Sequence, residues 1–252
     1  MSVRVLVLDV AADVARHVAG LFLRALRRPA VLGLATGGTT LPIYAALVEA
    51  HRANGASFRH ATTFNLDEYV GLDHEHPASF ARFMRGALFD HVDIDPGRVH
   101  LLDGAAPDPV AEAARYERAI KAAGGIGLQF LGIGANGHIG FNEPGSPLAS
   151  RTRCVTLTPS TRDANRRFFG GGTVPARALT MGIATILDAR EIILAATGAR
   201  KARAVACAID GPITPECPAS ALQTHPSATI ICDRDAAAGL NRRSSGAPCA
   251  TS

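Results

Sequence analysis

Short apolar segments alternate with segments of helical periodicity along most of this 252-residue chain. The apolar segments are residues 3–8, 30–35, 61–66, 128–133, 153–157, 191–196 and 228–232. Strands that alternate with helices in this way form parallel sheets covered by helices. The sequence therefore predicts an α/β fold with a doubly wound, mostly parallel, Rossmann-like sheet and helices on both faces.

Composition is typical of one folded domain, with 47% hydrophobic and 19% charged residues. No internal repeat or linker interrupts residues 1–240, so we expect a single domain there. Residues 241–252 (NRRSSGAPCATS) are polar and rich in small residues, and we expect a disordered tail.

Charge and cysteine usage narrow the class of protein. The net charge of +4 is dispersed along the chain, which suits an anionic small molecule and gives no sign of a nucleic-acid partner. Five cysteines without a C-x-x-C pair argue against a disulfide framework and a zinc site. With no signal pattern and no apolar run of membrane-spanning length, we expect a cytoplasmic protein that has no membrane partner.

The stretch 131–145, LGIGANGHIGFNEPG, is the strongest candidate site. It follows an apolar strand, and ligands bind in open α/β sheets at loops that follow strands. Its polar residues are Asn136, His138, Asn142 and Glu143, four within eight positions. A histidine can act as a base near neutral pH, and a carboxylate can orient it. The alternative, a glycine-rich turn with an ordinary loop histidine, is less consistent with so many clustered polar groups.

Two further strands are followed by groups suited to an anion. Thr36, Gly37, Gly38 and Thr39 follow the second strand and precede a helix, where backbone N–H groups and the helix dipole favour anions. The spacing is not that of a P-loop, and an ordinary strand–helix turn explains it equally well. Lys201 stands just beyond the strand 191–196, where it could meet a phosphate as a point charge.

Asp67 and Glu68 follow the third strand. Adjacent side chains of an extended segment point in opposite directions, so only one carboxylate can face a crevice. Asp67 is the better candidate for a base, and Glu68 is expected to pair with a cation or cap a turn. Three arginines, Arg162, Arg166 and Arg167, lie on a short helix that could be either a solvated face or an anion clamp.

Several of these segments together resemble the glucosamine-6-phosphate deaminase family. They include LGLATGGTT (32–40), TFNLDEYVGL (63–72), LGIGANGHIGFNEPGSPLASRTR (131–153), LTPSTRDANRRFF (157–169), VPARALTMGIATIL (174–187), TGARKA (197–202) and LQTHPSATIICD (222–233). The resemblance implies isomerisation and hydrolytic deamination of glucosamine 6-phosphate to fructose 6-phosphate and ammonia, in amino-sugar catabolism.

The resemblance also implies a role for individual residues. Asp67 moves the C2 proton, and His138 opens the sugar ring with help from Glu143 and Asn136. The substrate phosphate is held by Thr36, Gly37, Gly38, Thr39, Arg167 and Lys201. No metal ion and no organic cofactor is required.

Departures from the family pattern affect regulation. Members activated by N-acetylglucosamine 6-phosphate have a basic pair at positions 153 and 155 and hydroxyls near 146 and 147. This chain keeps Arg153 and Ser146 but has Val155 and Pro147, so we expect no such activation. The resemblance leaves the oligomeric state open, and a homo-oligomer is possible.

Two other functions compete. The first is a 6-phosphogluconolactonase, which has a similar glycine–histidine loop, but the continuation Phe141-Asn142-Glu143-Pro144 follows the deaminase pattern. The second is a non-catalytic sugar-phosphate sensor of a transcription regulator. A sensor would need a DNA-binding segment, which we do not find, and would be expected to lose its acid–base residues.

Overall fold

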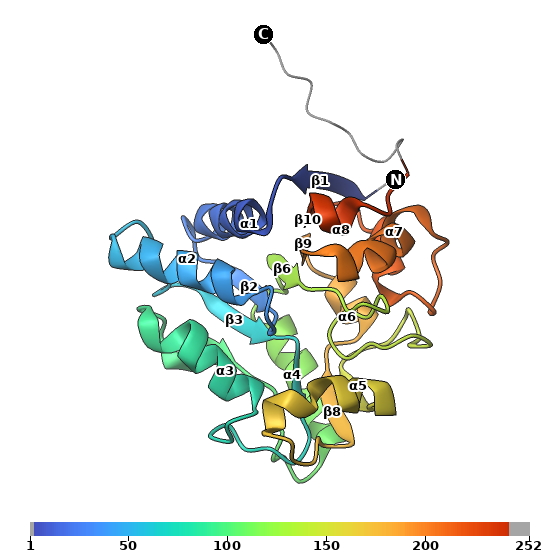
Figure 1. Cartoon of the computed structure of the whole chain (residues 1–252). Helices are drawn as coiled ribbons and strands as arrows, with labels where there is room; N and C mark the ends of the chain where they lie inside the picture. The colour runs from blue at the N-terminus through green and yellow to red at the C-terminus, as the bar shows by residue number, and fades with distance from the viewer. Residues whose placement is uncertain (1–2, 242–252) are drawn as a thin grey trace.

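Seven parallel strands form the central sheet of the computed structural model, which describes residues 3–241. Their order is β1–β10–β9–β6–β2–β3–β5 (Figure 1). The strands are β1 (Arg4–Leu8), β2 (Val31–Leu34), β3 (Thr62–Asn65), β5 (Val99–His100), β6 (Leu128–Leu131), β9 (Glu191–Ala196) and β10 (Ala228–Asp233). Six of them coincide with apolar segments of the sequence, and the predicted parallel α/β sheet is confirmed.

Helices connect the strands, and the turn chemistry of the sequence begins several of them. They are α1 (Ala11–Ala25), α2 (Leu41–Arg52), α3 (Phe80–Ala87), α4 (Pro109–Ala122), α5 (Pro159–Asn165), α6 (Ile183–Leu187), α7 (Ala202–Asp210) and α8 (Arg234–Ala237). Asp108 caps α4 and Thr158 caps α5, each accepting a hydrogen bond from a backbone N–H of the first turn. None of the helices in residues 3–241 is long and apolar enough to cross a membrane.

Two aromatic contacts show that helices cover both faces of the sheet. Phe22 of α1 packs edge-on against Phe130 of β6, with ring centroids 5.6 Å apart. Tyr116 of α4 packs in the same way against Phe64 of β3. Phe64 lies beside Gly33 and Gln129 in register, so its side chain projects to the face opposite that of Phe130. The doubly wound arrangement is therefore confirmed.

A second sheet of three antiparallel strands lies beyond the end of β3. It consists of β4 (Asp67–Tyr69), β8 (Arg177–Thr180) and β7 (Arg153–Thr156), in that order. The sequence predicts the strand at 153–157 but not these partners, because β4 and β8 are short and their pairing joins distant segments. Of the tail predicted for 241–252, all but Asn241 lies outside the described residues.

Candidate active site

Neighbouring parallel strands bring most of the predicted site residues to one edge of the sheet. β9, β6, β2 and β3 are adjacent, and their carboxyl ends therefore lie together. The segments that follow them carry, respectively, Lys201, the loop with His138, the turn at 36–39, and Asp67. This shared edge defines the candidate active site.

Asp67 begins β4 directly after β3 and is 7% exposed. Burial, together with the neighbouring Glu68 carboxylate, raises the pKa of Asp67 to about 8. The carboxyl is therefore poised to exchange a proton near neutral pH, as general base catalysis requires.

Glu68 points away from the site and caps α3, as the sequence predicts for one of its two expected roles. Its carboxylate accepts hydrogen bonds from the backbone N–H groups of Tyr69, Phe80 and Ala81, at 2.8–3.1 Å. Burial raises the pKa of Glu68, and these hydrogen bonds offset part of that effect. The helix terminus thus stabilises a negative charge next to Asp67.

His138 lies with its imidazole ring against Gly134, and its Nδ1 is buried without a hydrogen-bond partner. Burial, and then the positive charge of Lys201, lowers the pKa of His138 to about 4. The ring is therefore neutral at pH 7 and able to accept a proton. Lys201 donates a hydrogen bond from Nζ to the carbonyl of Ile133 at 2.6 Å, which fixes its ammonium beside the same loop.

Asn136 and Glu143 act on this loop in different ways. Asn136 is exposed, and its Oδ1 accepts a hydrogen bond from the backbone N–H of His138 at 3.3 Å. Glu143 is 7% exposed and binds α5: it accepts hydrogen bonds from Thr158 N–H and Oγ1 and from Thr161 Oγ1. Burial alone would raise the pKa of Glu143, but these hydrogen bonds outweigh it and lower the pKa.

The turn Thr36–Thr39 follows β2 and leads into α2. Gly37 has a φ of 116°, a conformation that strains other residues, and its carbonyl accepts hydrogen bonds from Thr40 N–H and Oγ1. Those two bonds fix the turn. Gly38 is exposed and Thr36 and Thr39 are half-buried, so the turn is open to a ligand.

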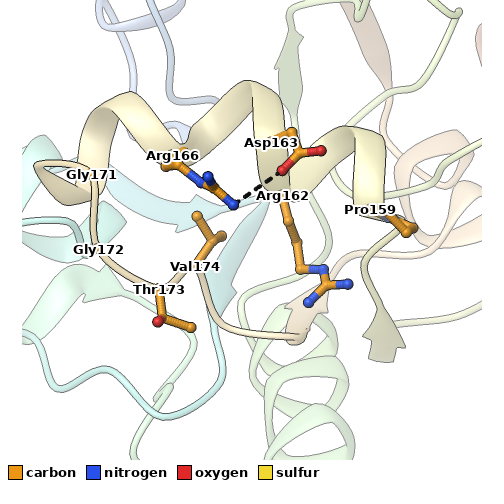
Figure 2. Close-up of a pocket in the computed structure, with 8 residues that line it drawn as sticks. All are labelled: Pro159, Arg162, Asp163, Arg166, Gly171, Gly172, Thr173 and Val174. Carbon is orange, nitrogen blue, oxygen red and sulfur yellow. Dashed lines mark hydrogen bonds and ion pairs between the residues drawn. The ribbon is translucent and has the colours of Figure 1, made fainter.

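Arg167, the remaining predicted phosphate ligand, lies on a different segment of the chain from the others. It belongs to the 3-10 helix η3 (Arg166–Phe169), is exposed, and has its guanidinium 4.7 Å from the centroid of the Phe168 ring. A cavity of about 390 Å³ lies against α5 and η3. Its lining includes Arg162 and Arg166 (Figure 2) but not Arg167. Arg166 pairs with Asp163 there, and Arg162 Nε is buried without a partner.

Asn142 and Thr180 also contact the site; the sequence prediction counts Asn142 among the polar residues of the loop without giving it a role, and it misses Thr180. A Cβ atom at Gly140 would lie 2.9 Å from Thr180 Oγ1, 3.4 Å from Asp67 Oδ2 and 3.7 Å from Asn142 Nδ2. These three polar groups therefore surround Gly140. The FNEP segment signals Asn142, but no local pattern signals Thr180, because its position depends on pairing with β4.

The fold and these side chains define an α/β protein that has carboxyl, imidazole and ammonium groups and an open glycine turn at one edge of its sheet. The chain belongs to the glucosamine-6-phosphate isomerase/6-phosphogluconolactonase family, whose model matches residues 7–231. The family resemblance of the motifs is thereby confirmed.

Individual relatives and solved structures show which proteins of this family the chain is similar to. A glucosamine-6-phosphate deaminase of Rhodopirellula baltica is 55% identical over 230 residues, covering 90% of this chain and 92% of the relative. A glucosamine-6-phosphate deaminase of Shewanella halifaxensis is 49% identical over 243 residues, covering 95% of this chain and 92% of the relative. The structure of a monomeric glucosamine-6-phosphate deaminase matches with a TM-score of 0.90 and 42% identity, covering 94% of this chain and 99% of that one. A 6-phosphogluconolactonase of Trypanosoma cruzi, at 21% identity and a TM-score of 0.76, shares the fold over 96% of this chain and 98% of its own.

Proposed function

We propose that this protein is a glucosamine-6-phosphate deaminase, which converts glucosamine 6-phosphate and water to fructose 6-phosphate and ammonia. The observation that carries the proposal is the buried Asp67, with a pKa near 8, at the sheet edge that also carries the Thr36–Thr39 turn and Lys201. Relatives named glucosamine-6-phosphate deaminase that match over nearly the whole chain support the same reaction.

Substrate binding begins at the phosphate. Backbone N–H groups of the Thr36–Thr39 turn, near the N-terminus of α2, and the Lys201 ammonium supply hydrogen bonds and positive charge. Arg167 joins them if the segment that carries η3 moves toward the turn. Anchoring the phosphate orients the sugar ring toward the loop that follows β6.

Ring opening requires a proton to move between the anomeric hydroxyl and the ring oxygen. His138 is neutral at pH 7 and has an unpartnered buried Nδ1, so it can accept that proton and return it. Asn136 orients the backbone of His138, and Glu143 keeps α5 in place and stabilises a transient imidazolium through its negative charge.

Asp67 carries out the aldose–ketose step. In its ionised form it removes the proton from C2, and the electron pair forms the C1–C2 double bond of an enolate as the C1 carbonyl oxygen takes up the negative charge. The protonated Asp67 then returns the proton to C1, the lone pair of the amino group forms the C2–N double bond, and an N–H proton passes to the C1 oxygen, which leaves an imine at C2. Water adds to that carbon and the C–N bond breaks, which releases ammonia and the ketose. No step requires a metal ion or an organic cofactor.

The experiment that tests this proposal is ammonia release from glucosamine 6-phosphate by the wild type and by Asp67→Asn. Release by the wild type and loss of at least about 1,000-fold in the variant, the range for removal of a general base, would support both reaction and base. Equal release by both proteins would remove Asp67 from this role. No release by either would contradict the proposed reaction, and 6-phosphogluconolactone would be the next substrate.

We extend the proposal to regulation, assembly and location. The replacement of two effector-binding positions by Val155 and Pro147 supports an enzyme that N-acetylglucosamine 6-phosphate does not activate. The proposal includes a homo-oligomer, which sedimentation equilibrium of the purified protein would test. A cytoplasmic location is supported by the four cysteines of the described residues, which are free thiols.

A further inference from the structure

Three side chains form a row across the small antiparallel sheet. Thr180 of β8 lies directly opposite Asp67 of β4 on one side and directly opposite Arg153 of β7 on the other. Directly opposite residues of antiparallel strands project to the same face. Arg153 therefore lies on the same face of this sheet as the proposed base, two strands away.

Asn142 connects this row to the loop that follows β6. Its side chain is completely buried. Nη1 of Arg153 donates a hydrogen bond to Asn142 Oδ1 at 2.8 Å. Nδ2 of Asn142 in turn donates to the carbonyls of Ile139 and Met181, at 2.9 and 2.8 Å. The amide thus joins the loop to the end of β8.

The guanidinium of Arg153 is committed to this amide rather than to an acid. Within residues 3–241, no carboxylate lies within ion-pair distance of Arg153, whereas Arg151 pairs with both Glu117 and Asp188. Arg153 is half-buried, and its burial disfavours the charged form. Nη1 of Arg153 also donates to the carbonyl of Arg151 at 3.4 Å, so the bond to Asn142 is the shorter of its two hydrogen bonds. Partial removal of a guanidinium from water without an acidic partner costs stability, and the hydrogen bond to Asn142 offsets part of that cost.

We propose that Arg153 and Asn142 are positioning residues for the deamination, an inference that rests on the proposed function. Through Asn142, Arg153 fixes the backbone at 139–142, and with it the separation between His138 and the carboxylate of Asp67. Arg153 therefore supports the reaction through this internal hydrogen bond to Asn142, and no effector molecule has to bind to it.

The test compares Arg153→Met, Arg153→Lys and Asn142→Ala, with Arg151→Met as the matched control. We expect Arg153→Met and Asn142→Ala to lower kcat about 10- to 100-fold and to change KM less than about threefold, because misplacement by about 1 Å costs rate rather than phosphate binding. Arg153→Lys keeps a donor for Asn142 Oδ1 and should recover much of the loss. The control, which removes two surface ion pairs, should stay within about threefold of the wild type.

A double variant tests whether the two residues act as one unit. Arg153→Met combined with Asn142→Ala should be little worse than either single change, because residues in one hydrogen-bonded network are not additive. Additive losses, or a kcat of Arg153→Met equal to that of Arg151→Met, would overturn the proposal.

Amide hydrogen exchange separates this inference from the proposed function. Backbone amides of residues 139–142 should exchange faster in Arg153→Met than in Arg151→Met, whichever substrate the enzyme uses. If the wild type releases no ammonia but these amides lose protection in Arg153→Met, the proposed reaction fails, whereas the structural link from Arg153 through Asn142 to residues 139–142 stands. If their protection is unchanged, the link fails. If Arg153→Met does not fold, Asn142→Ala, which breaks the same hydrogen bond from the other side, carries the same comparison.

Discussion

The imidazole ring of His138 occupies the space that a Cβ atom on Gly134 would need. Three ring atoms lie too close to that position for any side chain to fit, with Nε2 at 2.5 Å. The backbone N–H of Gly134 also donates to the carbonyl of His138 at 2.9 Å, so the two residues are held together by backbone and ring alike. Glycine at 134 is therefore a requirement of the ring's position.

Gly134→Ala should displace the His138 ring and lower kcat about 10- to 100-fold, since the new methyl group and the ring cannot share the space. Gly132→Ala is the matched control, because a Cβ there meets nothing within 4 Å. Steady-state ammonia release by both variants gives the comparison. Equal activities would show that the ring has another productive position.

The pH dependence of kcat/KM should report Asp67. Only the ionised carboxylate removes the C2 proton, and the pKa of Asp67 is about 8 in the free enzyme. We therefore expect kcat/KM to rise with pH and to level off above an apparent pKa of about 8. An activity that is already constant from pH 5 upward would contradict this assignment.

Asp67→Asn should make the folded protein more stable at alkaline pH. The pKa of Asp67 is raised from 3.8 to about 8 on folding, so between these values the unfolded chain loses a proton that the folded protein keeps. The stability that protonated Asp67 contributes is complete below pH 3.8 and is lost as the pH rises to 8.

Thermal denaturation should show this stability difference between Asp67→Asn and the wild type as a pH-dependent shift in melting temperature. At pH 8 the variant should melt on the order of 5–10 °C above the wild type, and near pH 4 the two should nearly coincide. The exposed Asp90→Asn is the control and should show no such trend with pH. A variant that melts below the wild type at pH 8 would contradict the burial argument.

Lys201→Met should raise KM for glucosamine 6-phosphate about 10- to 100-fold, the loss expected for a charge-assisted hydrogen bond. The chain contains one other lysine, Lys121 on α4, and Lys121→Met serves as the control. Inorganic phosphate as a competitive inhibitor gives a second measurement: its inhibition constant should rise in the Lys201 variant only. If both variants bind phosphate like the wild type, Lys201 does not contact it.

Local chemistry explains what the sequence could predict. Apolar runs mark six of the seven sheet strands. The polarity break after β3 marks Asp67 as the inward carboxylate and leaves Glu68 either to pair with a cation or to cap a turn, of which the structure shows the capping role. Each of these signals lies within a few residues of the feature it predicts.

Contacts between distant segments explain what was missed. The pairing of Thr180 with Asp67 and the bond from Arg153 to Asn142 depend on where separate strands meet, which no local pattern encodes. Likewise, Glu143 accepts hydrogen bonds from Thr158, the N-cap residue of α5, and from Thr161 within that helix, and both belong to a segment separate from the loop that carries Glu143.

The small antiparallel sheet has a consequence for the order of folding. β4 follows β3 at once, but its partner β8 is made much later in the chain, after β6 and β7. Closing so long a loop is slow compared with forming helices and neighbouring strand–helix units. During refolding from denaturant, helical circular dichroism should therefore return before ammonia release does, because the carboxylate of Asp67 acquires its surroundings only when β8 docks.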